Sequence, residues 1–145
     1  MTRGKNWAKR AEITARVVAK FSGRAFDWAS GATCLHLARE QARQMGHRGL
    51  PRIPALAGPA DALRALQAQG AGSLAELLDQ HFERLPAPAF ARVGDLVMAE
   101  RPDGMPESVG IADGTGNVFG WHDTDEGGLK PLKNVAAHLT AGWKL

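Results

Sequence analysis

The character of the chain changes near Pro86 and Pro88. Before this point, apolar residues recur with helical spacing, and after Phe90 short β-like runs alternate with Gly, Asp and Asn turns. The predicted helices cover about residues 6–21, 33–45 and 59–70, with one more opening after Ser73, and the predicted strands cover about 95–99, 108–112, 117–121 and 142–145. Segregated helices and strands predict an α+β fold, with a helical part over about 6–85 packed on a small antiparallel sheet built from about 90–145.

The size and composition favour one globular domain over residues 1–145. Hydrophobic residues make up 44% of the chain and charged residues 23%, which is ordinary for a globular protein. No run approaches the roughly 20 apolar residues that span a bilayer, and charges interrupt the N-terminus where a signal peptide would be apolar. We therefore expect no membrane span, no signal peptide and synthesis in the cytoplasm.

Several functional classes lack their sequence signatures. A single cysteine excludes an internal disulfide and a Cys-rich zinc site. The chain contains no P-loop, dinucleotide fingerprint, Gly-x-Ser-x-Gly elbow or His-Glu-x-x-His motif. We expect no cofactor and no metal.

Positive charge gathers in the first third of the chain. Residues 1–52 hold 11 Lys and Arg against 3 Asp and Glu, whereas residues 53–145 hold 7 against 12. A nucleic acid, an anionic lipid or an acidic protein surface could each meet such a face. A solvated helix face is the simpler explanation of the charge, because no nucleic-acid motif accompanies it, and we expect no specific nucleic-acid partner.

The stretch from Phe26 to Ala38 contains the sole cysteine, Cys34. Small residues lead into an apolar helical run, and Ser30 or Thr33 can supply the oxygen that caps the helix. Cys34 then lies in or just before the first turn, where the helix dipole and unpaired amides lower the pKa of a thiol. The alternatives are a cysteine nucleophile and a small buried hydrophobic residue.

The order of motifs along the chain resembles a known family. Trp28 and Cys34 are followed far downstream by Gly94 and Asp95 and then by the run Ser-Val-Gly-Ile that contains Gly110. Over about residues 16–145 this order resembles the NlpC-like, papain-type cell-wall cysteine peptidases, and especially the short phage and prophage tail proteins of that fold. The resemblance implies a single NlpC-like domain with the cysteine helix packed on the sheet.

One departure from the resembling peptidases concerns the catalytic base. Active members have a histidine immediately before the Val-Gly-Ile strand, and this chain has Ser108 there. A serine hydroxyl cannot accept a proton at neutral pH, so Cys34 would lack its usual activating partner. The resemblance places the third triad member on the next strand, so His122 could serve as a substitute base, or it could be a loop histidine. His36 would point away from Cys34 on a helix.

Other polar residues have simpler interpretations. Gly94 and Asp95 are most simply a turn that leads the chain into the sheet, although a catalytic part for Asp95 stays open. The loop 123–128 resembles a calcium loop but lacks its third oxygen ligand and its closing glutamate. His138 is most simply a surface residue in a helix or turn.

Two functional hypotheses follow from these residues. The first is a phage or prophage tail-tip or baseplate component, a structural part of the virion that contacts other tail proteins and whose peptidase site is degraded. The second is a cysteine peptidase or amidase that cuts peptidoglycan stem peptides during phage entry, with Cys34 as nucleophile, His122 as base and amides near Cys34 as oxyanion donors. Both imply assembly in the host cytoplasm followed by a place in the virion tail.

Overall fold

A computed structural model describes residues 3–28, 30–99, 108–121, 129–133 and 138–145. The helices are α1 (Arg3–Phe21), α2 (Cys34–Gln44), α3 (Pro59–Ala68), α4 (Leu74–His81) and the short 3-10 helix η1 (Pro88–Phe90). The strands are β1 (Leu96–Ala99), β2 (Ser108–Ala112), β3 (Val118–Gly120), β4 (Lys130–Leu132) and β5 (Leu139–Trp143). The predicted α+β class is confirmed, with helices first and strands last.

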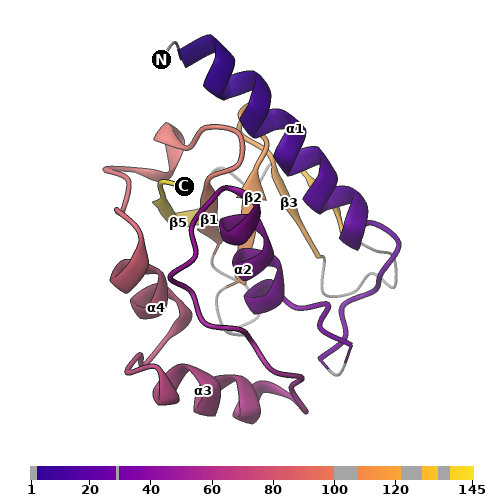
Figure 1. Cartoon of the computed structure of the whole chain (residues 1–145), viewed down its shortest axis with the longest axis vertical. Coiled ribbons are helices and arrows are strands. Elements are labelled where there is room, and N and C mark those ends of the chain that lie inside the picture. Colours follow the sequence, from indigo (N-terminus) through magenta and orange to yellow (C-terminus); the bar gives the residue numbers. More distant parts are fainter. Residues whose placement is uncertain (1–2, 29, 100–107, 122–128, 134–137) are drawn as a thin grey trace.

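The five strands form one antiparallel sheet in the order β4-β3-β2-β1-β5. In Figure 1, α1 and α2 lie across one face of this sheet, and α3 and α4 lie to one side of α2. The β1–β2 register pairs Leu96 with Ile111 and Ala99 with Ser108. A turn at Asp113–Gly116 joins β2 to β3, and the Asp113 amide donates to the Asn117 carbonyl at 3.1 Å.

The main core fills the space between the helices and the sheet. Its fully buried members include Leu37 and Leu78 from the helices and Leu96, Ile111 and Trp143 from the strands. Because side chains alternate across a strand, Val97, Ala112 and Val118 form a smaller cluster on the other face. No helix among the described residues combines the length and apolarity needed to cross a bilayer.

Helix α1 buries an apolar stripe against the body of the protein. Ile13, Val17 and Phe21, spaced four apart, are each at most 8% exposed, as their periodicity predicts. Arg10 falls on the same side and is 8% exposed. The expectation that the basic residues of this helix form a solvated face is therefore wrong for Arg10.

The predicted helix starts and stops are largely confirmed. Thr33 caps α2 by accepting from the His36 amide at 3.3 Å, so Thr33 rather than Ser30 supplies the oxygen. Ser73 caps α4 by accepting from the Glu76 amide at 3.1 Å. In a standard capping box the Glu76 carboxylate would accept from the cap residue itself, but here it accepts from the Gly72 amide.

Two strands differ from the sequence prediction. The sequence pattern does not predict β4, because this strand has three residues with Pro131 in the middle, and a proline argues against a strand. Strand β4 tolerates Pro131 because it lies at the edge of the sheet, where one side of the strand makes no ladder hydrogen bonds. The last strand runs over Leu139–Trp143 and so begins three residues before the predicted start at 142.

Candidate functional site

Cys34 is the first residue of α2, at the position where the sequence predicts it. Its side chain is partly buried and packs against the core cluster that contains Val109. Helix α2 packs directly on β2, the strand to which Val109 belongs. The cysteine therefore lies at a helix N-terminus beside the sheet, where free backbone amides favour an anion.

His36 forms a closed local network with the helix cap. Its Nδ1 lies 2.8 Å from Thr33 Oγ1, and its Nε2 lies 3.1 Å from the Pro54 carbonyl oxygen. These contacts fit a neutral ring that donates from Nε2 and accepts at Nδ1. Burial lowers the pKa of His36 below its ordinary value, although the bonds to the Pro54 and Ile53 backbone oppose this shift. Both ring nitrogens of His36 therefore have partners, Thr33 and Pro54.

The aromatic residues before Cys34 pack the loop onto the body of the protein. Trp28 packs against the core, and its ring meets Phe26 edge to face at 5.3 Å between centroids. Phe26 in turn contacts Trp121 at 5.8 Å, and Trp121 Nε1 donates to the Arg24 carbonyl at 2.8 Å. These contacts fix the loop before Cys34 against the body of the protein.

Ser108 is the first residue of β2 and is partly buried. It lies at one end of the β1–β2 ladder, opposite Ala99. Two residues on, Gly110 is required by close packing, because a Cβ there would lie 2.4 Å from Val118 Cγ1 and 2.5 Å from the Phe119 carbonyl oxygen. Gly110 is thus a structural residue, which accounts for its place in the motif.

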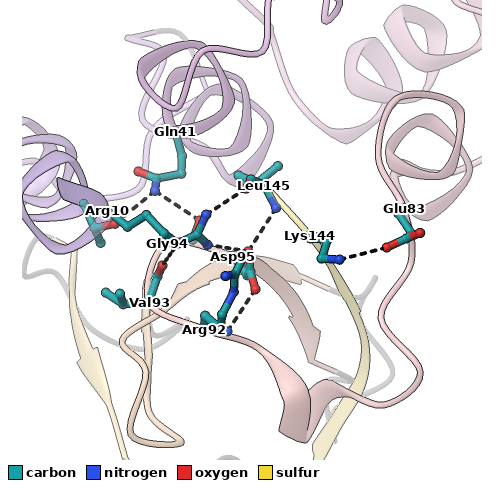
Figure 2. A network of polar contacts seen from close by, with 10 residues as sticks. Arg10, Gln41, Glu83, Arg92, Val93, Gly94, Asp95, Lys144 and Leu145 are labelled. Carbon is teal, nitrogen blue, oxygen red and sulfur yellow. Dashed lines mark hydrogen bonds and ion pairs between the residues drawn. The ribbon is translucent and has the colours of Figure 1, made fainter. Parts of the chain in front are cut away.

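Asp95 lies at the opposite end of the same ladder and is fully buried. Its Oδ1 accepts from Arg10 Nη2 at 2.6 Å and from the Leu145 amide at 2.9 Å, and its Oδ2 accepts from the Arg92 amide at 2.9 Å (Figure 2). Arg10 also donates to the backbone oxygens of Val93 and Leu145, at 3.0 and 2.7 Å. This set joins α1, the start of β1 and the end of β5, and we call it the Asp95 network.

The interpretation of Asp95 as a turn residue is correct but incomplete. The Asp95 amide closes a turn onto the Arg92 carbonyl at 3.0 Å, yet the side chain is the central acceptor of a buried ion pair. A signal for this role exists in the sequence: Arg10 continues the apolar spacing of α1, and Asp95 directly precedes an apolar strand. Opposite charges in two apolar patterns indicate a buried pair.

Gln41 ties α2 to the Asp95 network. Its fully buried amide donates to Thr14 Oγ1 and to the Gly94 carbonyl, both at 3.1 Å, and Figure 2 shows it above Gly94. Gly94 has a positive φ of 93°, and a Cβ there would lie 3.0 Å from Thr14 Oγ1 and 3.2 Å from Gln41 Nε2. Glycine is needed at this position for backbone conformation and for space.

The remaining predicted residues are His122, the loop 123–128 and His138. His122 and the loop 123–128 lie outside the described residues. His138 is described and exposed, immediately before β5, in agreement with its surface assignment. Among the described side chains, no group of three His, Cys, Asp or Glu residues could hold a metal ion.

The family model of a domain of unknown function, DUF6950, matches residues 2–144. The chain belongs to this family. Neither the curated proteins nor the solved structures provide a match. Within this DUF6950 domain, the two candidate regions are the N-terminus of α2 and the Asp95 network.

Proposed function

We propose that this protein is a structural component of a phage or prophage tail tip, built on an NlpC-like scaffold whose peptidase site is degraded. The observation that carries the proposal is Ser108, which begins the strand on which the cysteine helix packs. In the resembling peptidases this position holds the imidazole that deprotonates the thiol. A hydroxyl cannot do so at neutral pH.

The internal hydrogen bonds near Cys34 support the same interpretation. His36, the histidine nearest in sequence, uses both ring nitrogens for Thr33 and Pro54. The chemistry at this end of α2 is thus capping and packing. Fold resemblance alone does not transfer activity, so a scaffold role is consistent with the peptidase-like motif order.

The test of the structural role separates assembly from cell-wall cleavage. Purified protein incubated with isolated peptidoglycan sacculi should release no soluble stem-peptide fragments. In a phage that encodes the protein, Cys34→Ala should still build infectious tails, while deletion of the gene should stop tail assembly. Normal tail assembly combined with loss of infection in Cys34→Ala would contradict a purely structural role.

The second candidate, a cysteine amidase or endopeptidase acting on peptidoglycan, is favoured by the position of Cys34 at the first residue of α2. An amide-rich helix N-terminus stabilises a thiolate and can donate to an oxyanion. Iodoacetamide labelling of Cys34 as a function of pH distinguishes the two. A thiol that titrates well below the free value of about 8.5, and that shifts back in His122→Ala, would support the enzyme.

A matched gain-of-function variant sharpens this choice. Ser108→His places an imidazole at the start of β2, and Ser108→Ala is its control. If the scaffold is a degraded peptidase, Ser108→His should lower the pH at which Cys34 is labelled, whereas Ser108→Ala should leave it unchanged. An active enzyme that uses His122 should show the low titration already in the wild type.

A further inference from the structure

An open groove lies beside the Asp95 network. It has a volume of about 580 Å³ and is lined by Trp7, Arg10, Leu85, Pro86, Phe90, Arg92 and Lys144. Three elements distant in sequence therefore contribute: the first half of α1, the segment 85–92 around η1, and the residue after β5. Figure 2 shows Arg10, Arg92 and Lys144 around Asp95.

The groove combines aromatic walls with positive charge. Trp7 and Phe90 are 60% and 66% exposed, and they are two of the four large hydrophobic side chains exposed among the described residues. Leu85 and Pro86 add apolar surface to the same groove. Exposed aromatic side chains beside arginine are typical of protein interaction surfaces, where they serve as anchors.

The positive charges of the groove differ in how far the chain itself neutralises them. Asp95 pairs with Arg10, and Glu83 lies 3.3 Å from Lys144 Nζ. The backbone amide of Arg92 donates to Asp95, whereas no carboxylate among the described residues pairs with its guanidinium. None of the described residues that line the groove is acidic. One exposed arginine of a groove that also contains two exposed aromatic side chains is therefore left to meet an anion.

We propose that this groove binds a segment of a partner protein in which a carboxylate side chain stands next to apolar or aromatic residues. The carboxylate would pair with Arg92, and the apolar neighbours would pack on Trp7 and Phe90. Arg and aromatic anchors of this kind carry most of the energy in protein interfaces. The proposal goes beyond the tail-component function and does not depend on it.

Charge and exposure favour a peptide over two other occupants. A nucleic acid needs several unneutralised cations to follow its phosphates, and the described lining of the groove offers one. A small carboxylate ligand is normally enclosed over most of its surface, whereas the aromatic side chains here remain more than half exposed. A peptide segment lying across the groove can pair with the Arg92 guanidinium and pack on the exposed aromatic side chains at the same time.

A displayed library of random 12-residue peptides tests the proposal and does not require the partner to be identified first. We expect wild-type protein to enrich peptides that place Asp or Glu beside aromatic or aliphatic residues. Arg92→Glu should weaken binding of the enriched peptides at least tenfold, and Phe90→Ala at least threefold, in calorimetric titrations. Both side chains are exposed, so the variants should unfold at the wild-type urea midpoint.

Matched controls lie elsewhere on the surface. Arg52→Glu changes the charge by the same amount outside the groove, and Leu63→Ala removes an exposed leucine of α3. Each should change the affinity less than twofold. The proposal is overturned if no enriched peptide depends on Arg92, if the enriched peptides lack a carboxylate, if the controls weaken binding as much as the groove variants, or if single-stranded oligothymidylate binds as tightly as the best peptide.

Discussion

Helix α2 connects two regions that differ in how they are held together. At one end, Thr33 and His36 bond to each other, and His36 also contacts the Pro54 carbonyl, 18 positions away. At the other end, Gln41 reaches Gly94, and the Asp95 network joins Arg10 to residues more than 80 positions away. Gln41 lies seven positions after Cys34 in α2, a rise of about 10 Å along the helix axis.

The difference shows where the fold of this protein is fixed. Bonds between distant segments constrain the topology, because they form only when α1, β1 and β5 have assembled. Bonds within one turn or loop can form without the rest of the domain. We therefore expect the Asp95 end to contribute most to holding α1, β1 and β5 together. At the Cys34 end, the bonds of Thr33 and His36 order the helix cap and its neighbouring loop, and the long-range contacts there are mainly aromatic packing.

Asp95→Ala should have the largest effect on stability. It leaves the Arg10 guanidinium buried without its counter-ion and removes the acceptor of the Arg92 and Leu145 amides. We expect a loss of about 3–5 kcal/mol in the free energy of unfolding, measured by urea denaturation. Glu83→Ala, which breaks the exposed pair with Lys144, is the control and should cost about 0.5 kcal/mol or less.

A double variant checks the cause of this loss. Adding Arg10→Met to Asp95→Ala removes the unpaired charge. The double variant should therefore lose less free energy of unfolding than the sum of the losses in the two single variants. Strictly additive losses, or a loss below about 1 kcal/mol for Asp95→Ala alone, would contradict the idea that this end fixes the fold.

Two glycines with positive φ, Gly94 near Gln41 and Gly31 near His36, allow the packing at the two ends of α2 to be compared. Gly94→Ala forces a strained backbone and crowds Thr14 and Gln41, so we expect a loss of about 2–3 kcal/mol. Gly31→Ala has a similar φ, 81°, but its Cβ would meet His36 at 3.5 Å, an ordinary contact, and should cost about 1 kcal/mol. Equal losses in urea denaturation would mean that crowding at the Asp95 end does not matter.

The sequence predicts the local features of both ends well. Helix periodicity, the Thr33 cap and the Asp113–Gly116 turn depend on neighbouring residues, and all three are predictable. The Arg10–Asp95 pair is harder to predict: each charge stands in an apolar pattern, but the partners lie 85 positions apart, and each has a simpler local interpretation. Strand β4 is not predicted because a proline, Pro131, stands in its middle. The strand forms nevertheless because it lies at the edge of the sheet, a position that the sequence alone does not reveal.

Glu40, in the middle of α2, gives a pH test with a smaller effect. Burial raises the pKa of its carboxyl, but hydrogen bonds from Gln44, Arg43 and Lys20 more than offset this and lower it to about 2. Because the folded pKa lies below the unfolded value, the stabilisation is complete above about pH 4.5 and is lost as the pH falls towards 2. The partners are exposed, so we expect about 1–2 kcal/mol.

Glu40→Gln is the measurement for this group. The free energy of unfolding should be lower than that of the wild type at pH 7, and the difference should vanish near pH 2. Other carboxylates titrate in both proteins, so the difference between the two curves isolates Glu40. A difference that is constant between pH 7 and pH 2 would show that the charge of Glu40 is not what stabilises α2 against α1.

The smallest effect is expected at Ser108, at the end of the β1–β2 ladder far from Asp95. Its backbone pairs with Ala99, and its partly buried hydroxyl has no hydrogen bond within the described residues. Ser108→Ala should therefore change the free energy of unfolding by about 0.5 kcal/mol or less. The comparison with Asp95→Ala is informative because the two residues lie at opposite ends of the β1–β2 ladder. Ser108 pairs with Ala99, which lies four positions after Asp95, or roughly 13 Å along the strand. A loss above about 2 kcal/mol would mean that Ser108 stabilises this end of the ladder, which would remove the contrast with the Asp95 end.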